Sequence, residues 1–252
     1  MAKHDARMVG SRDEFIKMFR TMCGALNGWE VWTNLMEAYA CTLSNAMDPD
    51  AKRKEKREKA YERSIKVLGG VEKPAEMFAC LTMALDRNPN QDFLGEIFME
   101  LGLGSKWHGQ FFTPFNVSQM MAEVGIDTDL VKKQIDERGW VSINDPSCGA
   151  GSTLIGACTA LTRAHINYQT QALFIANDID PIAAQMCYIQ LSLLGCAGYV
   201  AVANTLTDPV TGPALFPDEK ESQTIWYTPM WWRDIWQGRR ICYLMDRDME
   251  RT

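Results

Sequence analysis

The sequence predicts an α/β protein in which a mostly parallel sheet follows a helical N-terminal domain. Three short segments, 141–144, 172–177 and 199–203, have strand-like composition and are bounded by turn residues. Two segments of helical length and pattern, 152–165 and 181–194, separate them. Strands and helices that alternate in this way form parallel sheets with right-handed crossovers.

The helical domain is predicted over residues 1–105 and the α/β domain over 106–252. Ser11 followed by Glu14 is typical of a capping box, in which two side chains satisfy backbone N–H groups at a helix start. Apolar stripes of methionine and aromatic residues in this domain indicate core packing. Further helices are expected over 29–47, from there to about 68, between 74 and 88, and over 92–103.

The bulk composition favours a cytoplasmic protein without a metal site. No apolar run has the length of a membrane span, and the N-terminus has no hydrophobic signal region. The eight cysteines are scattered and the three histidines lie far apart, so buried thiols are predicted and zinc ligands are not. The net charge is −6, whereas a protein that binds DNA unaided usually has a basic face. If DNA is the substrate, another subunit is expected to supply much of the contact.

One local basic run stands out against this acidic background. It contains Lys52, Arg53, Lys54, Lys56, Arg57 and Lys59. Because Glu55 and Glu58 interrupt it, a solvated helix face is favoured over a nucleic-acid surface.

The most informative segment is 141–157, VSINDPSCGAGSTLIGA, which predicts a strand, a tight glycine loop and a helix. Gly149 and Gly151 flank one alanine, and the helix is expected to begin at about Ser152. Such a loop lets backbone N–H groups approach a ligand at a helix N-terminus. It matches the dinucleotide fingerprint only in part, because Leu154 stands where the third glycine is expected.

Polar residues follow each of the three predicted strands, at the edge of the sheet where ligands bind in such folds. Asp145 ends the first strand, where a carboxylate can face a cationic amino-acid group. Asp178 follows the second and can accept hydrogen bonds from both ribose hydroxyls, because a carboxylate has two acceptor oxygens. Asn204 follows the third, and its amide can bond the edge of an adenine. Amino acid, ribose and adenine in this order describe S-adenosylmethionine (SAM).

Three segments resemble, in the same order, the motifs of adenine-N6 DNA methyltransferases of the type I modification-subunit kind. They are GQFFTP at 109–114, DPSCGAGSTL at 145–154 and NDIDP at 177–181. The resemblance covers roughly residues 90–206. It implies a Rossmann-like SAM-dependent methyltransferase fold, methyl transfer from SAM to adenine N6 in DNA, restriction-modification as the context, and a separate specificity subunit. It also implies the cofactor-binding residues Phe112, Thr113, Pro114, Asp145, Pro146, Cys148, Gly149, Ala150, Gly151, Asp178, Ile179 and Asn204.

The catalytic motif of that family, Asn/Asp-Pro-Pro-aromatic, does not occur in the sequence. In the family its polar side chain accepts a hydrogen bond from the target amino group, and the aromatic ring stacks on the flipped base. The best positional match is Thr228-Pro229-Met230-Trp231, after the strand-like segment 224–227. Thr228, Pro229 and Trp231 are therefore the predicted catalytic residues, in a degenerate form of the motif.

Each assignment has a structural alternative. Asp145 can cap the turn before the helix, Asp178 can be a solvated acid at a strand end, and Asn204 can stabilise a turn; Cys148 is interpreted as a small buried side chain. Residues 208–252 are predicted to be irregular, with a loop over 208–224 and an aromatic, arginine-bearing tail. Packing against the sheet is favoured for this tail over a nucleic-acid stacking platform.

Three functions are compatible with the sequence. The first is an adenine-N6 DNA methyltransferase that acts with a specificity partner. The second is a non-catalytic SAM-binding relative that serves as a binding or regulatory module. The third is a methyltransferase for a non-DNA substrate, which would explain the absence of a global basic face.

Overall fold

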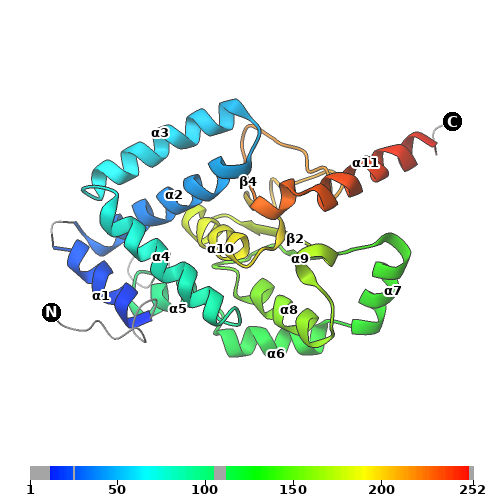
Figure 1. Cartoon of the computed structure of the whole chain (residues 1–252), viewed down its shortest axis with the longest axis horizontal. Helices are drawn as coiled ribbons and strands as arrows, with labels where there is room; N and C mark the ends of the chain where they lie inside the picture. Colours follow the sequence, from blue (N-terminus) through cyan, green and yellow to red (C-terminus); the bar gives the residue numbers. More distant parts are fainter. Residues whose placement is uncertain (1–11, 25, 105–111, 250–252) are drawn as a thin grey trace.

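The computed structural model describes residues 12–24, 26–104 and 112–249. A four-stranded sheet of order β1-β2-β3-β4 lies at the centre, with helices around it (Figure 1). β1–β2 and β2–β3 pair in parallel and β3–β4 pair antiparallel. The strands are β1 (Val141–Asp145), β2 (Ala172–Asp178), β3 (Ala197–Val202) and β4 (Thr224–Tyr227). The predicted mostly parallel α/β sheet is confirmed.

One face of the sheet is covered by the crossover helices. α8 (Ser152–Arg163) and the short α9 (Tyr168–Gln171) connect β1 to β2, and α10 (Pro181–Leu193) connects β2 to β3. Phe174 and Val200 point to this face and belong to the larger of two hydrophobic cores. Successive strands step across the sheet in one direction, so right-handed crossovers place both helices on the same side.

The other face is covered by the C-terminal segment. Leu173 and Tyr199, which alternate with the residues of the first face, form a second core with Leu215, Trp231 and Trp236. This arrangement agrees with the interpretation favoured from the sequence, in which the aromatic residues of the C-terminal tail pack against the sheet.

Residues 208–249, the described part of the segment predicted to be irregular, are more regular than predicted. After a loop, β4 is followed by the 3-10 helix η1 (Pro229–Trp232) and by α11 (Asp234–Met249). The start of α11 is fixed to the rest of the fold by Trp236, which is completely buried and donates a hydrogen bond to the carbonyl of Gln169, 67 positions away in the sequence.

In its described residues, the N-terminal part has five helices, which pack on the α10 side of the sheet (Figure 1). Their bounds are α1 (Arg12–Met22), α2 (Gly28–Met47), α3 (Ala51–Val67), α4 (Glu72–Arg87) and α5 (Phe93–Glu100). Side chains of these helices, Trp32 and Phe98 among them, belong to the same core as α8 and α10. Ser11 of the expected capping box lies outside the described residues.

Two helices between α5 and β1 had no predicted counterpart. α6 (Phe115–Gly125) packs closely on α8, where a Cβ atom on Gly156 would lie 2.8 Å from the carbonyl oxygen of Ser118. α7 (Thr128–Arg138) ends at Gly139, whose φ of +83° is the left-handed conformation common after helices. Among the described residues, every helix is too short or too polar to cross a membrane.

Candidate functional site

The glycine loop lies between β1 and α8, as predicted. Gly149 and Gly151 have φ angles of +53° and +96°, which cost glycine little and other residues more. The carboxylate of Asp145 accepts hydrogen bonds from the backbone N–H of Ser147, at 3.0 Å, and from the hydroxyl of Thr153. Asp145 therefore stabilises the turn, which was its alternative role, while its oxygens retain further acceptor capacity.

Direct hydrogen bonds join the loop after β1 to the end of β2. The backbone N–H of Gly149 donates to Oδ2 of Asp178 at 2.8 Å, and that of Cys148 donates to the carbonyl of Asn177 at 2.9 Å. Asp178 thus lies beside the glycine loop, as expected for parallel neighbouring strands.

The loop after β3 is joined to the other two. The hydroxyl of Thr205 donates to the carbonyl of Pro146 at 2.7 Å. The buried amide of Asn177 donates to the carbonyl of Ala203 and to the hydroxyl of Thr205, both at 2.7 Å. Asn177, which lies within the NDIDP segment but was not among the predicted site residues, therefore links the second and third loops.

Asp178 is a half-buried acid with acceptor capacity left. Its Oδ1 accepts the N–H of Asp180 at 2.9 Å in addition to the bond from Gly149 to Oδ2. Burial raises the pKa of this carboxyl group; the two backbone N–H donors lower it, and the charges of Asp180 and Asp145 raise it. Each oxygen still has a free lone pair for a ligand hydroxyl.

Asn204 and Ile179 lie at the same edge of the sheet. Oδ1 of Asn204 accepts the backbone N–H groups of Leu206 and Thr207, both at 3.0 Å, so its oxygen stabilises a turn. This leaves the amide nitrogen as the group that can bond an adenine edge. The side chain of Ile179 is exposed.

Of the first motif, the structure describes Phe112, Thr113 and Pro114, and it places Phe112 at the glycine loop. The ring of Phe112 lies so close to Gly149 that a Cβ atom there would be 2.9 Å from Cδ1 of the ring. Thr113 and Pro114 line a cavity of about 640 Å³ beside α5. Gly109, Gln110 and Phe111 of the motif lie outside the described residues.

The structure does not bring the predicted catalytic residues to this site. Because β4 is antiparallel to β3, Thr224 pairs with Val202 near the cofactor loops, whereas Tyr227 pairs with Tyr199. Thr228 follows at the opposite end of β3, completely buried, and its hydroxyl accepts the backbone N–H of Gly198 at 3.1 Å. Pro229 and Trp231 continue from there in η1, and Trp231 packs in the second core.

A buried network of hydrogen bonds, centred on Gln190 of α10, contacts the glycine loop. Nε2 of Gln190 donates to the carbonyl of Ala150 at 2.9 Å and to Oδ1 of Asp92 at 2.8 Å, and its Oε1 accepts the N–H of Leu94 at 3.1 Å. Gln190 is 0% and Asp92 2% exposed. The network therefore connects α5 of the N-terminal part to the cofactor loop. A glutamine within the apolar α10 segment was the sequence signal for it.

Asp92 gives the protein a specific pH dependence. Burial raises its pKa to about 6, although hydrogen bonds from Gln190 and the N–H of Gly95 oppose this shift. From about pH 4 to 6 the folded state holds a proton that the unfolded state has released, so stability falls as pH rises. Asp92→Asn is expected to flatten this slope and to remove up to about 2–3 kcal/mol of charge burial cost at pH 7.

Urea unfolding across this pH range measures the effect. The same substitution at Asp127, the exposed N-cap of α7, is the matched control and should leave the slope as in the wild type. An unchanged slope in Asp92→Asn would show that Asp92 is not the titrating group.

The donor and acceptor set of the three loops fits SAM. Its carboxylate matches the N-terminus of α8, where backbone N–H groups lack intrahelical partners. Its ammonium group matches the carboxylate of Asp145, and its ribose matches Asp178. The first two motif glycines have positive φ angles, and a Cβ atom would lie 2.9 Å from Phe112 at Gly149 and 3.0 Å from Cys187 at Gly151, so the tight loop requires glycine at both positions.

Over part of its length the chain is similar to known DNA methylases and methyltransferases. The model of the family "N-6 DNA Methylase" matches residues 95–244, more than half of the chain. A type I restriction enzyme methylase subunit of Methanocaldococcus jannaschii is 27% identical over 124 residues, which are 47% of this chain and 20% of that protein. A type II methyltransferase of Microbacterium ammoniaphilum is 33% identical over 107 residues, 40% of this chain and 29% of that protein. Each match thus spans less than a third of the relative's own length.

All three loops and the C-terminal segment up to α11 fall within the matched region. The chain belongs to the N-6 DNA methylase family.

Proposed function

We propose that this chain binds SAM at the carboxyl ends of β1, β2 and β3, in a Rossmann-like methyltransferase fold. The observation that supports it best is the direct hydrogen bonding between loops distant in sequence, above all the 2.8 Å bond from Gly149 N–H to Asp178. Such bonds preorganise the carboxylate and the glycine loop around one ligand position.

In this proposal each end of the cofactor has its own residues. Asp145, Pro146 and the backbone from Cys148 to Gly151 hold the amino-acid part, with Phe112, Thr113 and Pro114 beside it. Asp178 holds the ribose, and Ile179 and Asn204 border the adenine. When bound, SAM supplies an electrophilic methyl group on a sulfonium centre. The protein orients this group and excludes water from it.

The proposed reaction is methyl transfer to adenine N6 in DNA within a restriction-modification system. Family membership and the names of the two relatives, a restriction enzyme methylase subunit and a methyltransferase, support it. DNA is proposed to be presented by a separate specificity subunit, because the chain has a net charge of −6.

A second function is favoured by one observation, the burial of Thr228 at the far end of β3. The sequence has no Asn/Asp-Pro-Pro-aromatic tetrapeptide, and its nearest substitute lies away from the cofactor loops. The alternative is a SAM-binding protein that does not transfer the methyl group by itself and serves as a binding or regulatory module.

Two measurements separate these functions. Isothermal titration with SAM, with NAD as the control ligand, is expected to give micromolar binding of SAM alone; absence of SAM binding would overturn the proposal. Transfer of a labelled methyl group from SAM to duplex DNA then distinguishes the enzyme from the non-catalytic module.

Asp178→Ala is expected to weaken SAM binding by about 1–3 kcal/mol, roughly 5- to 150-fold, because charge-assisted hydrogen bonds to the ribose are lost. Titration calorimetry measures the change. Asp136→Ala, which removes an exposed carboxylate on α7, is the control with the same chemical change. Equal affinity in the two variants would remove Asp178 from the site.

A further inference from the structure

Helix α3 concentrates positive charge in an otherwise acidic chain. It contains eight cationic and three acidic residues, a net charge of +5, while the whole chain carries −6. Five of the cations recur at intervals of four and three residues and so lie on one face of the helix. They are Lys52, Lys56, Lys59, Arg63 and Lys66.

The acidic residues of α3 do not interrupt this face, although they interrupt the basic run in the sequence. Glu55, Glu58 and Glu62 are also three or four residues apart, and they form a separate stripe beside the basic one. The stripe from Lys52 to Lys66 extends over about 21 Å at 1.5 Å per residue, the length of about six base pairs of duplex DNA.

The basic stripe borders a cleft of about 480 Å³ that leads to the cofactor loops. Lys56 and Arg63 of α3 line one wall. Pro181, at the start of α10, and Val202, at the end of β3, also line the cleft. These two residues adjoin the Asp178–Asp180 and Asn204 loops, so the cleft reaches the same edge of the sheet as the proposed cofactor site.

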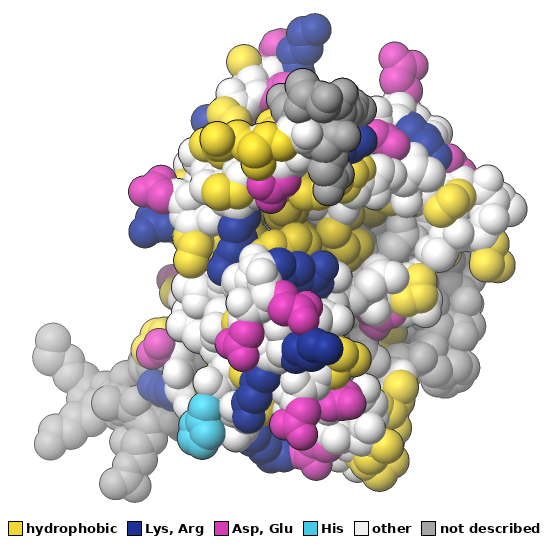
Figure 2. Space-filling model, turned by 90° about the vertical axis from the view of Figure 1, so that its right-hand side faces the viewer, with side chains coloured by type: hydrophobic (Ala, Val, Ile, Leu, Met, Phe, Trp, Pro, Cys, Tyr) yellow, Lys and Arg dark blue, Asp and Glu magenta, His cyan; other side chains and the backbone are white. Residues whose placement is uncertain are grey.

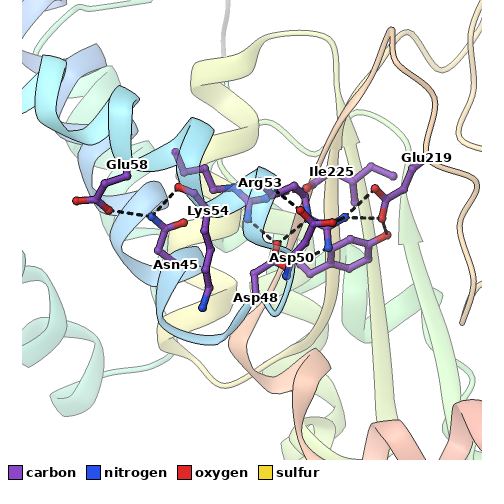
Figure 3. A network of polar contacts seen from close by, with 10 residues as sticks. Asn45, Asp48, Asp50, Arg53, Lys54, Glu58, Glu219 and Ile225 are labelled. Carbon is purple, nitrogen blue, oxygen red and sulfur yellow. Dashed lines mark hydrogen bonds and ion pairs between the residues drawn. The ribbon is translucent and has the colours of Figure 1, made fainter.

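Two of the cations at the cleft are available for a ligand. Arg53 and Arg57 are held by Asp48, and Lys220 is held by Asp208 at 2.8 Å (Figure 3 shows the Asp48 network). Within the part of the chain that the structure describes, Lys56 and Arg63 form no ion pair; both are exposed.

Three acidic residues also line the cleft, namely Glu37, Glu219 and Glu221. Glu219 pairs with Arg53 at 2.9 Å and accepts the hydroxyl of Tyr227. Glu37 accepts the hydroxyl of Ser64 at 2.7 Å. Five cationic side chains line the cleft against these three acidic ones, so the lining has an excess of positive charge, which favours an anionic ligand.

We infer that the basic stripe of α3 and this cleft bind the phosphodiester backbone of a nucleic acid. The inference rests on the proposed function for the identity of the polyanion. Charge complementarity along a straight helix suits the regular phosphates of a duplex. The position of the cleft would keep this backbone beside the cofactor loops, where a target base is needed. In this inference, the helix face that the sequence led us to expect in contact with solvent alone binds a ligand.

The test compares two variants that lose the same charge from different helices. Lys56→Gln/Arg63→Gln removes the two unpaired cations of the cleft, and Lys132→Gln/Lys133→Gln removes two exposed cations of α7. Figure 2 shows the face with α7, on which Lys and Arg side chains are interspersed with Asp and Glu. Fluorescence anisotropy with a labelled duplex of about 30 base pairs gives the Kd from about 0.05 to 0.2 M salt.

The α3 variant is expected to bind the duplex roughly 10-fold more weakly at low salt, and its log–log salt slope should be smaller by about 1–2, because each lost phosphate contact removes about 0.9. The α7 variant should match the wild type. Equal effects of the two variants, or an unchanged slope in the α3 variant, would overturn the inference. No duplex binding by the wild-type chain would also overturn it and leave the cleft to an acidic protein.

SAM titration of the same three proteins separates this inference from the proposed function. All three are expected to bind SAM equally, because Lys56 and Arg63 are not among the cofactor residues. If the proteins bind SAM but the Lys56→Gln/Arg63→Gln variant binds DNA as the wild type does, this inference is overturned and the proposed SAM site stands. An α3 effect on DNA binding without SAM binding overturns the proposed cofactor and leaves the nucleic-acid surface in place.

Discussion

Asp48→Ala is expected to lower the free energy of unfolding by about 3–5 kcal/mol, because it leaves the buried guanidinium of Arg57 without its counter-charge. The side chain of Asp48 is 0% exposed and accepts Nε of Arg53 at 2.8 Å and Nη1 of Arg57 at 2.6 Å. Arg57 in turn donates to the carbonyl of Ile225 and lies over the ring of Trp226, 4.8 Å from its centroid. Urea unfolding at neutral pH measures the loss.

The effect should be specific to this buried network, which joins α2 and α3 to β4 and to Glu219 in the loop before it (Figure 3). Glu55→Ala breaks the exposed pair of Glu55 with Lys59 on the same helix and is expected to cost at most about 0.5 kcal/mol. A loss in Asp48→Ala no larger than in this control would show that the network is not a stability determinant.

Acid should weaken the same network in the wild type. Burial alone would raise the pKa of Asp48, but hydrogen bonds from Arg53, Arg57 and the N–H of Asp50 hold it below its usual value. The contribution of Asp48 is therefore present above its unfolded pKa and is lost as pH falls through the lower folded pKa. This direction is opposite to that for Asp92.

The sequence predicted the elements whose signals are local. The three parallel strands and the two crossover helices lie within one or two residues of the predicted bounds. Their ends could be predicted because Asp-Pro pairs and glycines mark the boundaries between them. The proximity of Asp178 to the glycine loop followed from one general rule, that parallel strands present their carboxyl ends at one edge.

The remaining features depend on contacts between residues distant in the sequence. The segment 224–227 was identified as strand-like, but its antiparallel pairing with β3, which moves Thr228 to the far end, is a non-local choice. The ion pair of Arg53 with Glu219 joins residues 166 positions apart. Neither has a local pattern from which it could be predicted.

The basic run at residues 52–59 shows why a charge pattern in the sequence does not by itself predict a binding surface. Glu55 and Glu58 interrupt it in the sequence, and this favoured a solvated face. Once the helix is formed, the acidic and basic residues lie on separate stripes, and one stripe borders a cleft. The charge pattern is thus informative only in the helical register and beside its tertiary neighbours.

Gln190→Met is expected to destabilise the fold by about 3 kcal/mol and to weaken SAM binding, because three buried polar groups each lose a hydrogen bond at once. The groups are the carboxylate of Asp92, the carbonyl of Ala150 and the N–H of Leu94. Methionine fills a similar volume, so the loss reports hydrogen bonding and not a cavity. Unfolding in urea gives the stability, and titration with SAM gives the affinity.

The Asp92→Asn background tests whether this is one network. There the acid that loses the Gln190 hydrogen bond, and keeps only the one from the N–H of Gly95, is replaced by a neutral amide, so the second substitution should cost less than in the wild type, with a coupling of about 0.5–3 kcal/mol. The loss of SAM affinity should persist, because the bond to Ala150 is missing in both backgrounds. Additive stability effects would mean that Asp92 and Gln190 act independently. Unchanged SAM affinity in the folded Gln190→Met variant would mean that Gln190 supports the fold and does not position the cofactor loop.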